Sequence, residues 1–354
     1  MSKEERLRIL LRNFVEFEKD VEIAYIYSNQ GLLISKYSRS SSNVEDNKEL
    51  EKVHGAFTAI VENLLDKISS EYKIGHYGSG SFETSDHRII YLQAGQDAIL
   101  VLLCNYETNL NILFPMAYLI VEKIAQILEE SYDPRYNTLD VPDLWVNEKF
   151  SLGLDKHSVT NPEPVLEGIY PLHQIKMEKK KHLFKLIILG SAAVGKTTLV
   201  NQFLKKDHII DYRPTLGISI SSQKYFIQGK RDDTIEFLIY DLAGQEFFKR
   251  VRHQYYRGAS CAFVMYDVTR RDTFEEGLKY WLDDARKELG NIPFILIGNK
   301  IDLEDQRQIQ RDEGIQKAKE LKCFFTETSA LKNTNVQDTF KLVGIGLFFQ
   351  SNQN

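Results

Sequence analysis

One short segment constrains the fold of this 354-residue chain more than any other. Residues 190–197 have the sequence Gly190-Ser-Ala-Ala-Val-Gly-Lys-Thr197, which matches the pattern G-x-x-x-x-G-K-[ST]. An apolar strand is predicted before it, over 184–189, and a helix after it, over 196–206. The two glycines let the backbone curl so that successive N–H groups point inward, and the helix adds its positive N-terminal end. The segment therefore predicts a phosphate-binding loop at the start of an α/β domain.

Each residue of this loop is a candidate nucleotide ligand. The Lys196 ammonium is expected to reach the β- and γ-phosphates, and the Thr197 hydroxyl is expected to bind Mg²⁺. The candidate residues of the loop are Gly190, Ser191, Ala192, Ala193, Val194, Gly195, Lys196, Thr197 and Thr198.

Strand and helix patterns alternate after the loop. Short apolar runs are typical of buried parallel strands, and two neighbouring runs at the start have the pattern of a hairpin. We expect strands over 218–227, 235–241, 261–266 and 294–297, and helices over 273–289 and 312–321. This alternation predicts an α/β domain over residues 183–354, with a mostly parallel six-stranded sheet and helices on both faces.

Two further polar segments follow predicted strands. In Asp241-Leu-Ala-Gly244-Gln245, the carboxylate at the strand end can join Thr197 in holding Mg²⁺. The Gly244 N–H can contact a γ-phosphate, and Gln245 can orient an attacking water.

The segment Asn299-Lys300-Ile-Asp302 predicts a base site. An aspartate carboxylate accepts hydrogen bonds from the ring N–H and the exocyclic amine of guanine, a pair that adenine does not offer. Asp302 is therefore expected to select guanine. The segment Thr328-Ser329-Ala330 is expected to supply a backbone N–H for the keto oxygen of the base.

With these motifs at these spacings, residues from Lys185 to near the C-terminus resemble the Ras superfamily of small GTPases, and the Rab branch most closely. Further matching segments are Tyr212-Arg-Pro-Thr215, Tyr255-Tyr-Arg-Gly-Ala259 and Tyr266-Asp-Val-Thr-Arg-Arg-Asp-Thr273. The resemblance implies a P-loop NTPase fold, called a G domain. It also implies GTP and GDP as ligands, Mg²⁺ as cofactor, slow GTP hydrolysis, and effector and regulator proteins that bind the switch loops.

The resemblance also implies roles for single residues. Thr215 would sense the γ-phosphate, Tyr212 would shield the phosphates, and His208 occupies the position of a base-stacking Phe. Lys300 would pack its stem on the base, beside Asn299 and Asp302. The implied catalytic residues are Gln245, Lys196, Thr215 and Gly244, and the implied metal ligands are Thr197, Thr215 and Asp241.

Some positions depart from the family pattern. Ala192 and Ala193 replace residues that are often Gly or Ser, and a methyl group there can crowd an arginine supplied by an activating protein. No cysteine occurs among the last residues, so we expect no prenyl anchor and only indirect membrane contact.

The first half of the chain predicts a second, α+β domain over residues 1–131. We expect helices over 4–19, 45–70 and 111–131, strands over 21–27, 32–37, 89–94 and 98–105, and a further strand near Phe82. This order resembles the roadblock/LC7 family, with the longin family as the alternative, although longin domains begin with strands. The resemblance implies a regulatory or dimerisation module. His54, His76 and His87 have no catalytic companions, and the glycines at 75, 78 and 80 have the pattern of loops.

Residues 132–182 hold five of the eight prolines and are predicted to be a connector. The net charge of −5 divides into −8 for residues 1–183 and +3 for residues 184–354, so the halves attract each other weakly. Neither half is basic enough to predict nucleic acid as a partner. Three widely spaced cysteines and the absence of a long apolar run favour a cytoplasmic protein without a membrane span.

Two functions stay open at this stage. A switch enzyme would hydrolyse GTP and release its switch loops, whereas a nucleotide-bound scaffold would hydrolyse it negligibly. The presence of Gln245 and Thr215 favours the switch. We also expect residues 1–131 to dimerise the protein and to contact the G domain differently in the GTP and GDP states.

Overall fold

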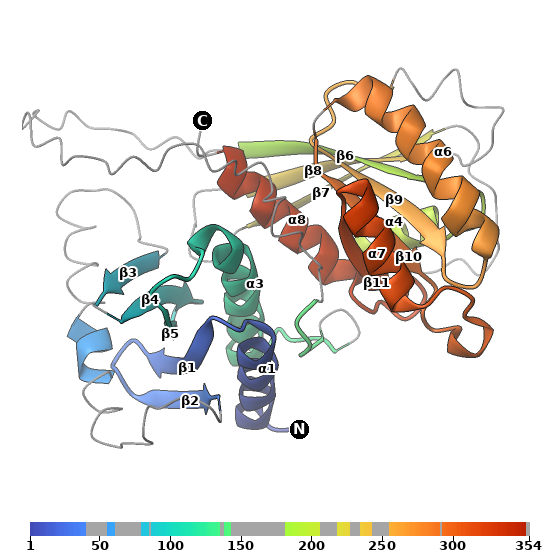
Figure 1. Ribbon diagram of the computed structural model, residues 1–354. Helices are drawn as coiled ribbons and strands as arrows, with labels where there is room; N and C mark the ends of the chain where they lie inside the picture. Colours follow the sequence, from blue (N-terminus) through green and yellow to red (C-terminus); the bar gives the residue numbers. More distant parts are fainter. Residues whose placement is uncertain are drawn as a thin grey trace, which may run out of the picture.

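The computed structural model describes residues 1–39, 55–60, 79–84, 86–134, 138–142, 181–205, 218–226, 234–242, 255–290 and 292–351. Two β-sheets with their helices account for most of them (Figure 1). The first half is an α+β domain and the second an α/β domain, as the sequence predicts.

The N-terminal half is an antiparallel sheet with two helices on one face. Its elements are α1 (Lys3–Phe17), β1 (Val21–Ser28), β2 (Leu33–Ser38), β3 (Ser79–Glu83), β4 (His87–Ala94), β5 (Ala98–Asn105) and α3 (Leu110–Leu128). The strand order is β2-β1-β5-β4-β3. The extra strand at Phe82 is confirmed, and Gly80 lies in this strand rather than in a loop. Within the predicted helix 45–70, residues 55–60 are helical and the others lie outside the described residues.

Local sequence explains where α1 begins and which face it buries. The Ser2 side chain accepts a hydrogen bond from the Glu5 N–H over 3.1 Å and thereby caps the helix. Leu7, Leu11 and Phe14 recur at helical spacing and are buried.

The second half is a six-stranded sheet covered on both faces. Its elements are β6 (Lys181–Gly190), α4 (Lys196–Phe203), β7 (Ile218–Phe226), β8 (Thr234–Leu242), β9 (Cys261–Asp267), α6 (Arg271–Leu289), β10 (Phe294–Asn299), a 3-10 turn (Glu304–Gln306), α7 (Arg311–Leu321), β11 (Phe324–Thr328) and α8 (Val336–Ser351). The order is β11-β10-β9-β6-β8-β7, and only β7 is antiparallel to its neighbour. The mostly parallel six-stranded sheet is confirmed.

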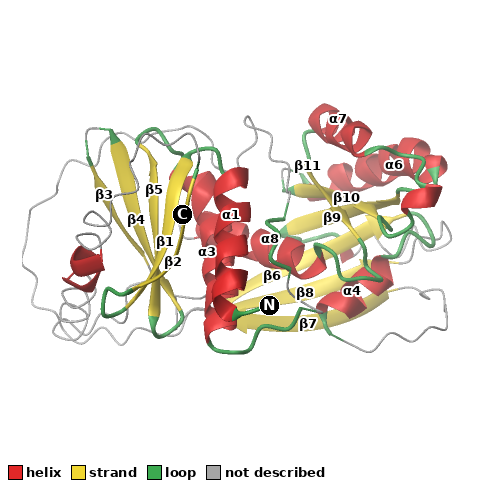
Figure 2. Ribbon diagram, turned by 90° about the horizontal axis from the view of Figure 1, so that it is seen from below, coloured by secondary structure: helices red, strands yellow, loops and turns green. Residues whose placement is uncertain are grey.

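Helix α8 joins the two halves. Figure 2 shows the first sheet, then α1 with α3, then α8 beside the second sheet. Helix α4 packs on α8 and on β6 and β8, while α6 packs on β9 and α7 on β10 and β11. Twelve residues of α8 are buried, because α3 covers one side and the second sheet the other. One apolar cluster runs through α1, α3 and α8 into the second sheet. Among the described helices, none is both long and apolar enough to span a bilayer.

Candidate active site

The phosphate-binding loop lies between β6 and α4, as predicted. Gly190 has a φ of 143° and Gly195 a φ of 99°, both in the region that favours glycine. A Cβ on Gly190 would lie 2.4 Å from the Met265 carbonyl oxygen, and one on Gly195 would lie 2.3 Å from Asn299 Nδ2. Both glycines are therefore required by backbone conformation and by close approach of the neighbouring strands.

The Lys196 ammonium is held inside this loop. Its Nζ donates to the carbonyl oxygens of Gly190, over 2.8 Å, and of Ser191, over 2.9 Å, and the residue is 7% exposed. Lys196 is also the first residue of α4, where unpaired N–H groups and the helix dipole favour an anion. Positive charge and N–H donors thus meet at one point, with Thr198 following in the same helix turn.

Two oxygen-bearing side chains meet beside this lysine. Thr197 Oγ1 donates to Asp241 Oδ2 over 2.5 Å, although the two residues come from α4 and from the end of β8. The other oxygen, Asp241 Oδ1, is buried and has no hydrogen-bond partner among the described residues. Burial raises the pKa of the Asp241 carboxyl, while the Thr197 hydrogen bond and the Lys196 charge lower it. A buried carboxylate with a spare oxygen next to a hydroxyl fits a Mg²⁺ ion, which prefers oxygen ligands.

Asn299 connects the predicted base segment to the phosphate loop. Its Nδ2 donates to the Val194 carbonyl over 2.8 Å, and its Oδ1 accepts from Thr328 Oγ1 over 3.1 Å and from the Ala330 N–H over 3.0 Å. The Ala330 N–H, one of those in the segment predicted to contact the guanine keto oxygen, thus donates to Asn299 in this structure. Its contact with a base stays a prediction.

Asp302 and Ser329 are also brought together. Ser329 Oγ donates to Asp302 Oδ1 over 2.5 Å, and the Lys332 N–H donates to the same hydroxyl over 3.0 Å. This arrangement fixes the rotamer of the carboxylate that is predicted to select guanine.

The sequence analysis missed a buried carboxylate, Asp267, at the end of β9. Its Oδ2 lies 2.6 Å from Lys300 Nζ, and its Oδ1 accepts from the N–H and the hydroxyl of Thr269. Burial alone would raise the pKa of Asp267, but these contacts hold it below its ordinary value. Arg270 lies beside this carboxylate, and its Nη2 donates to the Ala192 carbonyl over 2.9 Å. The signal was available, because Asp267 follows a buried apolar run just as Asp241 does.

The remaining predicted site residues lie outside the described residues. They are His208, Tyr212, Thr215, Gly244 and Gln245. Their roles stay predictions.

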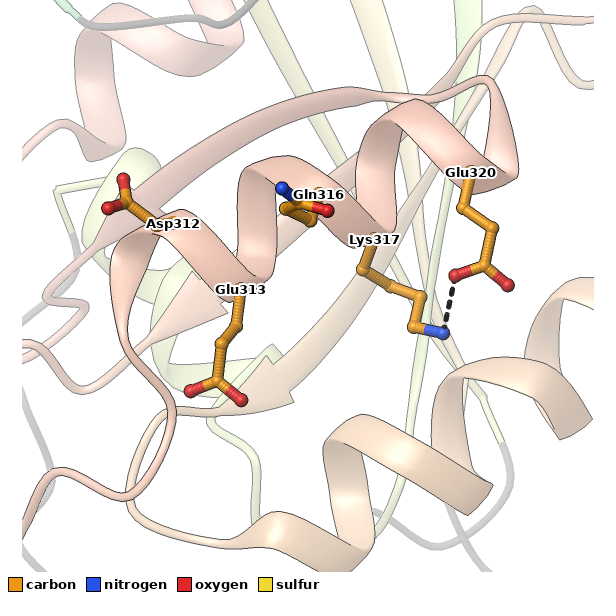
Figure 3. A pocket seen from close by; sticks show the side chains of 5 residues that line it. All are labelled: Asp312, Glu313, Gln316, Lys317 and Glu320. Atoms are coloured by element: carbon orange, nitrogen blue, oxygen red, sulfur yellow. Dashed lines mark hydrogen bonds and ion pairs between the residues drawn. The ribbon is translucent and has the colours of Figure 1, made fainter.

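A separate hollow lies on the surface of α7. All five residues that line it come from this one helix, and Lys317 pairs with Glu320 over 2.8 Å (Figure 3). None of the phosphate-loop or base-segment residues lines it, so we assign it no part in nucleotide binding. Its lining residues are Asp312, Glu313, Gln316, Lys317 and Glu320.

Comparison with known proteins agrees with this geometry. The model of the Ras family matches residues 185–345. The Ras-related protein RABA5e of Arabidopsis thaliana is 38% identical over 171 residues, which are 48% of this chain and 77% of that protein. The Ras-related protein RABA5b of the same plant is 40% identical over 165 residues, which are 46% of this chain and 74% of that protein. This chain belongs to the Ras family.

Membership in the Ras family identifies the ligands of the site. The Ras-family domain binds GTP and GDP with Mg²⁺, and it is a GTP-hydrolysing enzyme. The described residues contain four parts of that site: the loop, the Thr197–Asp241 pair, the Asn299 network and the Asp302–Ser329 pair. The matched segment leaves the N-terminal half uncovered.

Proposed function

We propose that this protein is a GTP-dependent switch whose N-terminal domain regulates or assembles the Ras-family domain. The observation that carries the proposal is the convergence of Thr197 and Asp241 beside the Lys196 ammonium. That group of side chains fits a Mg²⁺–triphosphate, because it combines oxygen ligands for the ion with a positive charge for the phosphates.

Each residue contributes a distinct chemical effect. Lys196 and the N-terminal end of α4 stabilise negative charge that spreads over the phosphate oxygens during cleavage. Thr197 and Asp241 would hold Mg²⁺, which neutralises phosphate charge when bound. Asp302 and Asn299 orient the base, so that the γ-phosphate lies at the loop in one fixed pose.

The switching mechanism depends on site residues that are predicted from the sequence and lie outside the described residues. Thr215 and Gly244 would contact the γ-phosphate, and Gln245 would position the attacking water. Loss of the γ-phosphate removes those contacts, so both loops change conformation. The six-stranded sheet with the phosphate loop at the carboxyl end of β6 supports this proposal, because it is the framework in which such loops work.

The N-terminal half supports a regulatory or assembly role. Its antiparallel five-stranded sheet with α1 and α3 on one face is compatible with the roadblock/LC7 resemblance, and it begins with a helix rather than with a strand. Self-association through this half stays a prediction, which light scattering on the full-length protein would test.

Hydrogen exchange tests the switch directly. We expect segments 206–217 and 243–254 to exchange more slowly with a non-hydrolysable GTP analogue bound than with GDP bound. Thr215→Ala should abolish this difference, whereas Thr269→Ala, outside the predicted switch loops, should retain it. Equal exchange in the two nucleotide states of the wild type would favour the scaffold function instead.

A further inference from the structure

The two halves of the molecule meet at a specific helix pair, α3 and α8 (Figure 2). The two helices are antiparallel, because Phe114 of α3 contacts Phe349 of α8 while Lys123 contacts Asp338. Two ion pairs of opposite polarity cross this contact. Lys123 Nζ of α3 lies 2.6 Å from Asp338 Oδ2 of α8, and Glu122 of α3 pairs with Lys341 of α8. Reciprocal charges of this kind fix the register of one helix on the other.

The Lys123 ammonium is completely satisfied at this contact. Besides Asp338, its Nζ donates to the carbonyl oxygens of Thr138 and Asp140, each over 2.9 Å. Three N–H donors therefore meet three acceptors in a side chain that is 1% exposed. Thr138 and Asp140, at the start of the predicted connector, thus contact α3 at the helix pair.

Aromatic packing extends the contact to the other end of α8. Phe349 stacks on Phe114, with ring centroids 6.0 Å apart, and lies 5.3 Å from the Tyr118 ring. On the opposite side of α8, Phe340 stacks on Phe203 of α4 with centroids 4.0 Å apart. The helix is therefore held by the N-terminal half on one face and by the nucleotide-binding half on the other.

The first turn of α8 reaches the phosphate-loop helix. Gln337 Nε2 donates to the carbonyl oxygens of Gln202, over 2.9 Å, and of Phe203, over 3.2 Å. These are the last residues of α4, whose first residue is Lys196. Gln337 and Asp338 are neighbours, so one turn of helix contacts α4 through the first and α3 through the second.

A short loop, held by hydrogen bonds across it, joins the same turn of α8 to the base segment. Ser329 and Thr334 exchange two backbone hydrogen bonds of 3.1 Å each, and Asn335 Nδ2 donates to the Glu327 carbonyl over 2.9 Å. Ser329 in turn donates to Asp302. A displacement at the start of α8 would therefore be transmitted to the residues that hold the base.

We propose that the N-terminal half acts as a built-in clamp on the first turn of α8 and thereby slows the release of bound guanine nucleotide. The inference rests on the proposed function, because it concerns the same site. With α3 docked, the first turn of α8 is held in place and contacts both the base segment and the end of α4. Opening of the nucleotide site requires this turn to move. The clamp acts on release and leaves association unchanged, so it strengthens nucleotide binding, and by linkage bound nucleotide strengthens the docking by the same factor.

A charge exchange at the Glu122–Lys341 pair tests the clamp. These side chains are 18% and 13% exposed, so a reversal of charge is tolerated better there than at the Lys123–Asp338 pair. Fluorescent GDP is loaded on the full-length protein, and its release into excess unlabelled GDP is followed. We expect Glu122→Lys and Lys341→Glu each to release GDP about five- to tenfold faster, and the double variant to return to within about twofold of the wild type.

A matched control removes a pair that does not touch α8. Lys3→Glu breaks the exposed Lys3–Glu130 contact between α1 and the end of α3 and should leave release unchanged. Release at the wild-type rate in both single variants would overturn the clamp, and so would a double variant as fast as the singles. A wild type that does not bind GDP would instead contradict the proposed function.

A second measurement keeps the inference testable if a single variant fails to fold. In the wild type, amides of α3 should exchange more slowly with GDP bound than after nucleotide removal, because docking and binding are linked. Identical exchange of α3 in both states would overturn the clamp. Slower exchange with GDP would support it without any substitution.

Discussion

Asp302 lies half-buried beside Ser329, whose hydroxyl donates to Oδ1, while Oδ2 has no hydrogen bond to that side chain. Replacement by Asn turns an acceptor into a donor at the base, which matches the extra keto oxygen of xanthine. Asp302→Asn should therefore weaken GTP binding by roughly 10²-fold or more and favour xanthosine triphosphate. Competition binding measures both affinities. Asp305→Asn, an exposed control in the adjacent turn, should bind GTP like the wild type, and unchanged GTP affinity in Asp302→Asn would contradict the base assignment.

Glu18, directly after α1, gives the protein a pH dependence unrelated to nucleotide. Burial, with the nearby charge of Asp20 adding to it, raises the pKa of Glu18 to about 7. Between its ordinary pKa of 4.5 and about 7, the folded state binds more protons here than the unfolded state does, so this residue lowers stability as pH rises through that window. Glu18→Gln should reduce the loss of unfolding free energy over this pH window by on the order of 1 kcal/mol, since Gln does not titrate. The effect is no larger because the Glu18 side chain is only partly buried. Urea unfolding at pH 5 and pH 7.5 measures it, and parallel pH profiles for wild type and variant would contradict it.

Single residues of the site differ in how far the sequence could predict them. Lys196, Thr197 and Asp302 belong to motifs with fixed spacing. In the structure, Lys196 Nζ contacts the loop carbonyls, Thr197 contacts Asp241, and Asp302 contacts Ser329. The position of Asp267 at a strand end could be predicted from the apolar run before it, but its pairing with Lys300 and the contact of Arg270 with Ala192 depend on the order of strands in the sheet. Sequence spacing carries no information on that order.

Among the elements, the phosphate loop contains an unusual backbone conformation at a non-glycine residue. Ala193 has a φ of 63°, in the left-handed region, whereas Ala192 does not have a positive φ. The left-handed conformation destabilises the folded state by about 1–2 kcal/mol for a residue with a Cβ. A glycine avoids this strain but loses more conformational entropy on folding, which costs about 0.5–1 kcal/mol. Ala193→Gly should therefore stabilise the protein by about 0.5–1 kcal/mol, and the control Ala192→Gly should destabilise it by a similar amount.

Urea unfolding of both glycine variants with saturating GDP measures these changes. The GDP affinity of each variant is determined in parallel, because bound ligand adds to apparent stability. Equal shifts of the two midpoints in the same direction would contradict the strain at Ala193.

The elements also differ in how well the sequence predicts them. Strands β9 and β10 are short apolar runs, and their buried, parallel placement is confirmed. Helix α8 is apolar on nearly all sides, which indicates burial on two faces but does not identify the second partner. That partner, α3, contains the charged pair Glu122-Lys123 within an apolar helix, and only the docked structure shows why those charges are tolerated.

The whole molecule has one apolar cluster that runs from α1 and α3 through α8 into the second sheet. This shared cluster determines the expected result of removing the N-terminal half. Residues 1–131 are expected from the sequence to dimerise the protein, so removal of residues 1–175 would convert a dimer to a monomer. In the structure, that removal uncovers the α8 face that carries Phe349 and leaves Asp338 without Lys123. We therefore expect residues 176–354 alone to bind a hydrophobic dye and to associate, as judged by fluorescence and light scattering. A monomeric truncated chain without dye binding would contradict a shared core.

The central claim is that the intact molecule turns over GTP as a slow switch enzyme. Single-turnover hydrolysis of GTP by the full-length protein, followed by phosphate release, tests it most directly. We predict a rate of about 10⁻⁴ to 10⁻² s⁻¹ for the wild type, a rate slower by at least about tenfold for Gln245→Leu, and a wild-type rate for the exposed control Gln306→Leu. Phosphate release no faster than from GTP in buffer, or equal rates for wild type and Gln245→Leu, would contradict the account.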